Sequence, residues 1–110
     1  MHDMSITQNI VEICEANAEN RRVVAVTLQI GRLSGVVPDA VEFCFDACIR
    51  GTLLERARLI IEEIPGKGRC VTCGEEYPMD TLFTECRACG GFGAELLSGD
   101  ELRVKELEVE

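Results

Sequence analysis

Two Cys-x-x-Cys pairs are the residues whose spacing points most directly to chemistry. Cys70 and Cys73 form the first pair and Cys86 and Cys89 the second, with twelve residues between the pairs and a glycine directly after each pair. Four thiolates on two tight turns are the ligand set of a structural Zn²⁺ site, although iron in a rubredoxin-like cage would use the same sulfurs. We predict that the two glycines are needed because a Cβ would crowd the turns around the sulfurs.

The remaining cysteines, and the residue patterns typical of enzyme active sites, give weaker evidence for a function. A thiol–disulfide oxidoreductase using one Cys-x-x-Cys is the enzymatic alternative, but two matched pairs favour metal ligation. With one histidine there is no Cys/His or Ser/His pair, so we predict that the chain is not an enzyme. Cys44 and Cys48 lie one helical turn apart and could bind a metal, but their Phe and Ile neighbours favour core packing. Cys14 receives the same interpretation.

The only histidine, His2, lies near the chain terminus, where a side chain commonly has no role. A bulky second residue should leave Met1 in place, so its amine is available. That amine, the His2 backbone nitrogen and the His2 ring Nδ1 can close adjoining chelate rings around Ni(II) or Cu(II), which prefer nitrogen-rich square-planar sites. Asp3 could supply a fourth ligand. The alternative is a zinc-ribbon adaptor that binds only proteins, with an inert His2.

Composition restricts the classes of partner. The formal net charge is −9, and the eleven basic residues are scattered among twenty acidic ones, which opposes nucleic-acid binding and favours a basic protein surface. We find no apolar run of roughly 20 residues and no charged leader, so we expect a cytoplasmic chain with no membrane partner. An odd number of cysteines, seven, fits reduced thiols better than disulfides.

Hydrophobic periodicity predicts the elements of the first half of the chain. A helix is expected from Met4 to about Ala18, capped by Ser5 or one turn earlier by Asp3, with a buried face of Ile6, Ile10, Ile13 and Cys14. Alternation over residues 24–30 predicts a half-buried strand. A second helix should follow a capping pair, Asp39 and Glu42, and end before Gly51, with a buried face of Val41, Cys44, Phe45, Cys48 and Ile49.

The second half should hold a strand, the metal lobe and a last strand. Residues 57–64 are expected to form the strand, and Tyr77, Phe83 and Phe92 to support the lobe, with Pro78 in a loop. The last strand changes its alternation phase, which predicts a β-bulge near Lys105 or Glu106. The predicted fold is therefore α+β: a small three-stranded sheet with two helices on one face, plus an inserted zinc-ribbon-like lobe. Residues 1–65 and 98–110 would form an α/β domain, and residues 66–97 the inserted zinc-binding domain.

Four segments around the cysteine pairs carry a resemblance to a known family. They are M-H-D-M-S-I-T-Q, V-T-L-Q-I-G-R-L-S, F-C-F-D-A-C-I-R-G-T and E-L-R-V-K-E-L-E-V-E. Over nearly its whole length the chain resembles the HypA/HybF family, the nickel metallochaperones of [NiFe]-hydrogenase maturation.

The resemblance implies transient Ni(II) binding by His2, the Met1 amine and Asp3, and structural Zn(II) on Cys70, Cys73, Cys86 and Cys89. It also implies two partners, a HypB-type GTPase and the [NiFe]-hydrogenase large-subunit precursor, with a monomeric or homodimeric chaperone; related chaperones also serve urease. Two positions depart from the family pattern. Asp3 stands where Glu is usual, and Val37 stands where many members have an acidic residue.

Overall fold

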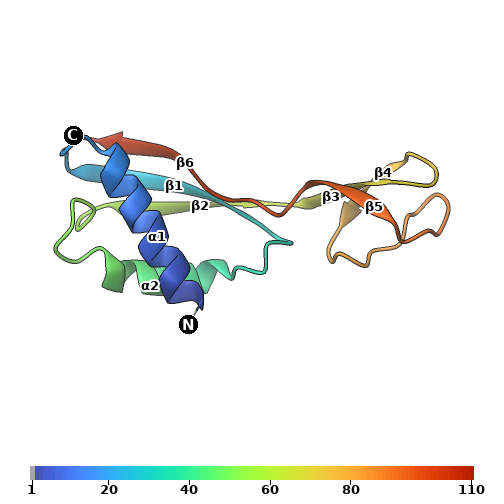
Figure 1. Cartoon of the computed structure of the whole chain (residues 1–110), viewed down its shortest axis with the longest axis horizontal. Coiled ribbons are helices and arrows are strands. Elements are labelled where there is room, and N and C mark those ends of the chain that lie inside the picture. The colour runs from blue at the N-terminus through green and yellow to red at the C-terminus, as the bar shows by residue number, and fades with distance from the viewer. Residues whose placement is uncertain (1) are drawn as a thin grey trace.

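The computed structural model describes residues 2–110, which form an elongated molecule of 53 × 26 × 17 Å (Figure 1). Its two three-stranded sheets have the orders β2-β1-β6 and β4-β3-β5, and the second sheet is inserted between two strands of the first. This arrangement confirms the predicted α+β fold and its element order. The elements are α1 (His2–Asn17), β1 (Val23–Gly31), α2 (Pro38–Cys48), β2 (Arg58–Ile64), β3 (Gly66–Cys70), β4 (Glu76–Met79), β5 (Ala94–Ser98) and β6 (Leu102–Val109).

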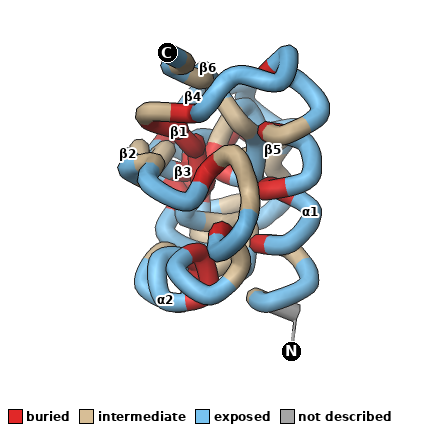
Figure 2. The backbone as a smooth tube through the Cα atoms, turned by 90° about the vertical axis from the view of Figure 1, so that its left-hand side faces the viewer, coloured by how far each residue is buried: buried red, intermediate tan, exposed pale blue. Residues whose placement is uncertain are grey.

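The larger sheet has β1 at its centre, parallel to β2 and antiparallel to β6. Both helices cover the same face of this sheet (Figures 1 and 2). That face buries Val26, Leu28 and Ile30. The strand is more buried than the predicted half-buried one, because its polar face is covered as well. There Gln29 donates to Glu62 Oε1 at 3.1 Å and accepts from Arg103 Nε at 2.6 Å, so the side chains of both neighbouring strands shield it.

Helix α1 begins at His2, earlier than either predicted start, so neither Ser5 nor Asp3 caps it. Its buried face also differs from the prediction. Ile13 is 52% exposed, whereas Ile10 and Cys14 are buried as expected, and the unforeseen members are Thr7 and Val11. Burying Thr7 is tolerated because its hydroxyl donates to the Asp3 carbonyl at 2.6 Å, which satisfies the polar group inside the helix. The contact with the sheet, rather than hydrophobicity alone, selects the face.

Helix α2 begins with Pro38 as its first residue, directly after Val37. The predicted capping pair is therefore wrong: Asp39 lies within the first turn, and proline is well suited to the first helical position because it lacks an N–H. The predicted buried face is confirmed, since four of its five members are buried and Cys48 packs against the core. The chain leaves this helix through Gly51 at φ +75°, a backbone conformation that favours glycine.

The predicted β-bulge is confirmed in β6. Thr27 pairs with Glu106 and Leu28 pairs with Val104, which leaves Lys105 as the additional residue. The ammonium group of Lys105 lies 3.3 Å from both carboxylate oxygens of Glu62 on the other edge strand. The bulge thus accounts for the change in alternation phase along this strand.

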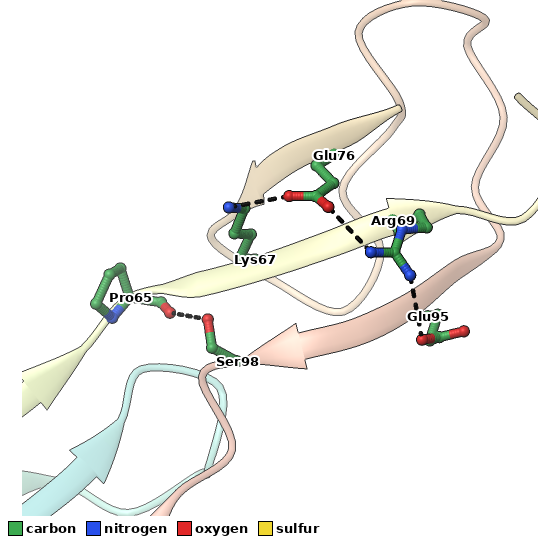
Figure 3. A network of polar contacts seen from close by, with 6 residues as sticks. All are labelled: Pro65, Lys67, Arg69, Glu76, Glu95 and Ser98. Atoms are coloured by element: carbon green, nitrogen blue, oxygen red, sulfur yellow. Dashed lines mark hydrogen bonds and ion pairs between the residues drawn. The ribbon is translucent and has the colours of Figure 1, made fainter. Parts of the chain in front are cut away.

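The two sheets are joined where their backbones pack closely. Leu33 N donates to the Gly99 carbonyl at 2.6 Å, and Ser98 Oγ donates to the Pro65 carbonyl at 3.0 Å (Figure 3). A Cβ on Gly99 would lie 2.6 Å from the Cα of Gly66. Only glycines allow this approach, so they help to set the position of the lobe relative to the larger sheet.

Candidate metal centre

The four predicted thiol ligands converge at the tip of the inserted lobe. The Sγ atoms of Cys70, Cys73, Cys86 and Cys89 all lie within 4.8 Å of one another. Cys70 Sγ is 3.5 Å from Cys89 Sγ, and Cys73 Sγ is 3.7 Å from Cys86 Sγ. A tetrahedral ion with Zn–S bonds of about 2.3 Å requires sulfurs about 3.8 Å apart. The four-cysteine site therefore fits zinc.

The two Cys-x-x-Cys turns are built alike. Gly74 N donates to the Cys70 carbonyl and Gly90 N donates to the Cys86 carbonyl, both at 2.9 Å. Gly74 and Gly90 have φ angles of +79° and +77°. A Cβ on Gly74 would meet nothing within 4 Å, so the prediction of crowding is wrong. The turns favour glycine because their backbone is left-handed, a conformation that a Cβ penalises.

The electrostatics of the four thiols favour a cation between them. Backbone N–H groups of Cys73 and Thr72 lower the pKa of Cys70 to about 6. The N–H of Glu75 acts in the same direction on Cys73, but burial and the neighbouring Cys86 and Cys70 raise the pKa of Cys73 above its ordinary value. One thiolate thus forms readily and opposes ionisation of the next. A divalent cation at the centre would remove this repulsion.

The lobe has a very small interior, which changes the predicted role of its aromatic residues. Tyr77 is 1% exposed, and its hydroxyl donates to the Thr84 carbonyl at 3.1 Å. Phe83 and Phe92, by contrast, are 81% and 60% exposed, so their predicted supporting role is wrong. Pro78 lies in β4 rather than in a loop, which is tolerated because β4 is an edge strand. The buried cluster of the lobe consists of Cys70, Tyr77, Met79 and Cys86, so two of the four converging cysteines form part of its small core.

The three strands of the lobe are also connected across their exposed face (Figure 3). Arg69 on β3 contacts Glu76 on β4 at 3.0 Å and Glu95 on β5 at 3.7 Å, while Lys67 contacts Glu76 at 3.0 Å. Because these side chains are largely solvent-exposed, each ion pair contributes little stability. The network nevertheless links both edge strands to the central strand that leads into Cys70.

The second predicted metal site falls only partly within the described chain. Met1 and the side chain of His2 lie outside the described residues, so their predicted ligand roles stay predictions. Asp3 is half-buried in the first turn of α1. In Figure 1, that turn lies beside α2 on the side of the larger sheet, away from the four-cysteine lobe. The fold thus keeps Asp3 apart from the four-cysteine site.

One sulfur contact was not anticipated from the sequence. Cys48 Sγ at the end of α2 lies 3.4 Å from Met4 Sδ in the first turn of α1. The helical spacing of Cys44 and Cys48 indicated that they share a face, but no local pattern indicates which residue of α1 would reach them.

No helix within residues 2–110 combines the length and the apolar character that crossing a membrane requires.

Comparison with known proteins identifies the family. The family model described as "Hydrogenase/urease nickel incorporation, metallochaperone, hypA" matches residues 1–109. The hydrogenase maturation factors HypA of Geobacter metallireducens and Geobacter sulfurreducens are 66% and 62% identical to this chain over 110 residues, covering all of both chains in each case.

Solved structures share the fold. The solution structure of the Ni metallochaperone HypA from Helicobacter pylori matches with a TM-score of 0.70 and 20% identity, over 97% of this chain and 96% of that chain. A second solution structure, of "HypA protein", matches with a TM-score of 0.73 and 22% identity, over 100% of this chain and 97% of that chain. The full-length family match and the high identities show that this chain belongs to the HypA family of nickel metallochaperones in hydrogenase maturation, which are not enzymes.

Proposed function

We propose that this chain binds Ni(II) through the Met1 amine, His2 and Asp3, and delivers it to a [NiFe]-hydrogenase large-subunit precursor together with a HypB-type GTPase. The match of the nickel-incorporation family to residues 1–109 carries the proposal, because it spans both predicted metal sites. The exposed Glu12 and Glu19 on and just after α1, together with a net charge of −9, offer a surface to a basic patch on a partner.

The start of α1 supports a weak and reversible nickel site. The first N–H groups of a helix have no acceptor within the helix, so the amide nitrogens of His2 and Asp3 can lose their protons to solvent and bind an ion without breaking helical hydrogen bonds. The positive end of the helix dipole opposes a cation there, while the Asp3 carboxylate in the same turn offsets this effect. A chaperone that must release its cargo needs such a balance.

The four-cysteine lobe has a different role in this proposal. Four thiolates fill the coordination shell of Zn²⁺ and leave no open position for a substrate or a transferable ion. Residues 66–97 would then be a zinc-stapled domain, and residues 1–65 and 98–110 a nickel-binding domain. We place both in the cytoplasm, as a monomer or a homodimer.

Equilibrium dialysis of the untagged protein tests the proposal. The wild-type protein should take up nickel at micromolar concentrations in addition to zinc, while His2→Ala should abolish nickel binding and leave the zinc content unchanged. Ser5→Ala, a change at an exposed position of the same helix, is the matched control and should bind nickel as the wild type does. Uptake of zinc without nickel would refute the proposal and favour the zinc-ribbon adaptor.

The same preparations test the other metal and the enzymatic alternative. A colourless protein with tightly bound zinc supports the structural zinc site, whereas the red colour of a ferric thiolate centre would contradict it. Unreactive thiols in the zinc-loaded protein would exclude an oxidoreductase that uses Cys70. Reactive thiols in a zinc-free native protein would favour that enzyme.

A further inference from the structure

Two sulfur-containing side chains, Met4 and Cys48, are in contact where α1 crosses α2, away from the four-cysteine lobe. Cys48 Sγ donates a hydrogen bond to Met4 Sδ at 3.4 Å. Cys44 precedes Cys48 by one helical turn, which places both thiols on the same side of α2. Met4 is 37% exposed and Cys48 is half-buried, so this contact lies at the open edge of the interface between the helices.

The side chains of Met4, Cys44 and Cys48 all offer sulfur as the metal-binding atom. Thiols and thioethers are soft ligands that select Cu(I) over magnesium or calcium ions. We propose that Met4, Cys44 and Cys48 form a binding site for a soft monovalent cation such as Cu(I), separate from the four-cysteine centre. This inference does not rest on the proposed nickel function.

Binding would convert a hydrogen bond into a metal bridge. The Cys48 thiol would lose its proton to solvent, and Cu(I) would join the resulting thiolate to the Met4 thioether without a change of oxidation state. Cys44 would complete a three-coordinate sulfur site after a similar proton loss. The bridge would tie the first turn of α1 to the last turn of α2.

Simple core packing accounts for Cys14 but does not account for the contact between Cys48 and Met4. Cys14 is fully buried in the aliphatic core, where a small apolar side chain is sufficient. Cys48 instead directs its S–H to a second sulfur at a solvent-accessible edge. Burial and the nearby Cys44 raise the pKa of Cys48, which keeps the thiol protonated and less reactive until an ion displaces the proton.

A titration with Cu(I) tests the inference on the full, reduced and zinc-loaded chain under anaerobic conditions. Methyl-¹³C labelling gives one signal for each of the three methionines of the chain. The first equivalent of Cu(I) should shift the Met4 methyl signal while zinc stays bound. Competition with a chromogenic Cu(I) chelator should show an affinity at least about tenfold weaker in both Met4→Leu and Cys48→Ser, because each removes a sulfur ligand.

Met79→Leu is the matched control, since it removes a thioether in the lobe and should leave this affinity unchanged. Leucine conserves the volume of methionine, so Met4→Leu should stay folded, as far-UV circular dichroism can verify. Three results would overturn the inference: an unmoved Met4 signal, release of zinc by the first equivalent, or unchanged Cu(I) affinity in folded Cys48→Ser.

Discussion

Replacing Gly31 by alanine should destabilise the junction between the two sheets. A Cβ at this position would overlap the carbonyl group of Gly99 and lie 2.6 Å from Asp100 N. Carbon atoms in contact need roughly 3.5 Å, so the facing carbonyl group must retreat by about 1.5 Å. That movement disrupts two hydrogen bonds, Gly31 N to Glu101 O at 2.7 Å and Leu33 N to Gly99 O at 2.6 Å. With about 1 kcal/mol for each bond and about 1–3 kcal/mol for overpacking, we expect a loss of roughly 3–5 kcal/mol.

Urea denaturation of the zinc-loaded protein, followed by far-UV circular dichroism, measures this loss. Gly35→Ala is the control that separates crowding from backbone strain. Gly35 has a φ of +80°, but a Cβ at this position would meet nothing within 4 Å, so alanine there should cost only about 1–2 kcal/mol. If Gly31→Ala cost no more than Gly35→Ala, the close backbone packing at the junction would be refuted.

Three further changes have defined expectations. Val37→Asp should raise the free energy of unfolding by about 1 kcal/mol in urea denaturation, because Val37 precedes α2 and cannot accept the N–H bonds that an aspartate would accept. Ile10→Ala should lower the same quantity by about 2–5 kcal/mol, whereas Ile13→Ala should cost less than about 1 kcal/mol, since their side chains are 5% and 52% exposed. Zinc affinity of the metal-free protein, measured against a competing chelator, should fall as the pH decreases from about 9 to about 6. The thiols of Cys73 and Cys89 have raised pKa values, so zinc must displace their protons over this range, whereas the pKa of Cys70 is lowered to about 6 and its thiolate persists until the pH falls through that value.

A specific result would contradict each of these three predictions. Val37→Asn retains the capping acceptor without the charge, so a gain with Asp alone would show that the helix dipole, rather than capping, is responsible. Equal losses at Ile10 and Ile13 would contradict the observed orientation of α1. A zinc affinity that does not change with pH over this range would show that protons do not compete with the metal at Cys73 and Cys89.

The convergence of the four cysteines could be predicted from the sequence because their arrangement is largely local. Each Cys-x-x-Cys pair forms one tight turn, and the hairpin between the pairs has only to bring two such turns together. The bulge at Lys105 was predictable for a related reason. Side chains alternate strictly along a strand, so a change of phase in the hydrophobic pattern identifies an additional residue without knowledge of the partner strand.

The helix boundaries and buried faces were less predictable. Both Asp3 and Ser5 are residue types that commonly cap a helix, but α1 begins at His2, before either of them. Likewise, the helical spacing permits either Ile13 or the pair of Thr7 and Val11 to face inwards. The contact with the sheet decides between them, and an internal hydrogen bond allows Thr7 to be buried.

The sequence by itself therefore determined which four cysteines converge, the order of the elements and the position of the bulge, because these follow from short-range spacing. Only the tertiary structure decided the parallel pairing of β1 with β2, the glycine junction between the sheets and the contact of Met4 with Cys48. These features join residues that are distant in the chain. Their geometry depends on how whole elements pack, and no local pattern of side chains encodes that packing.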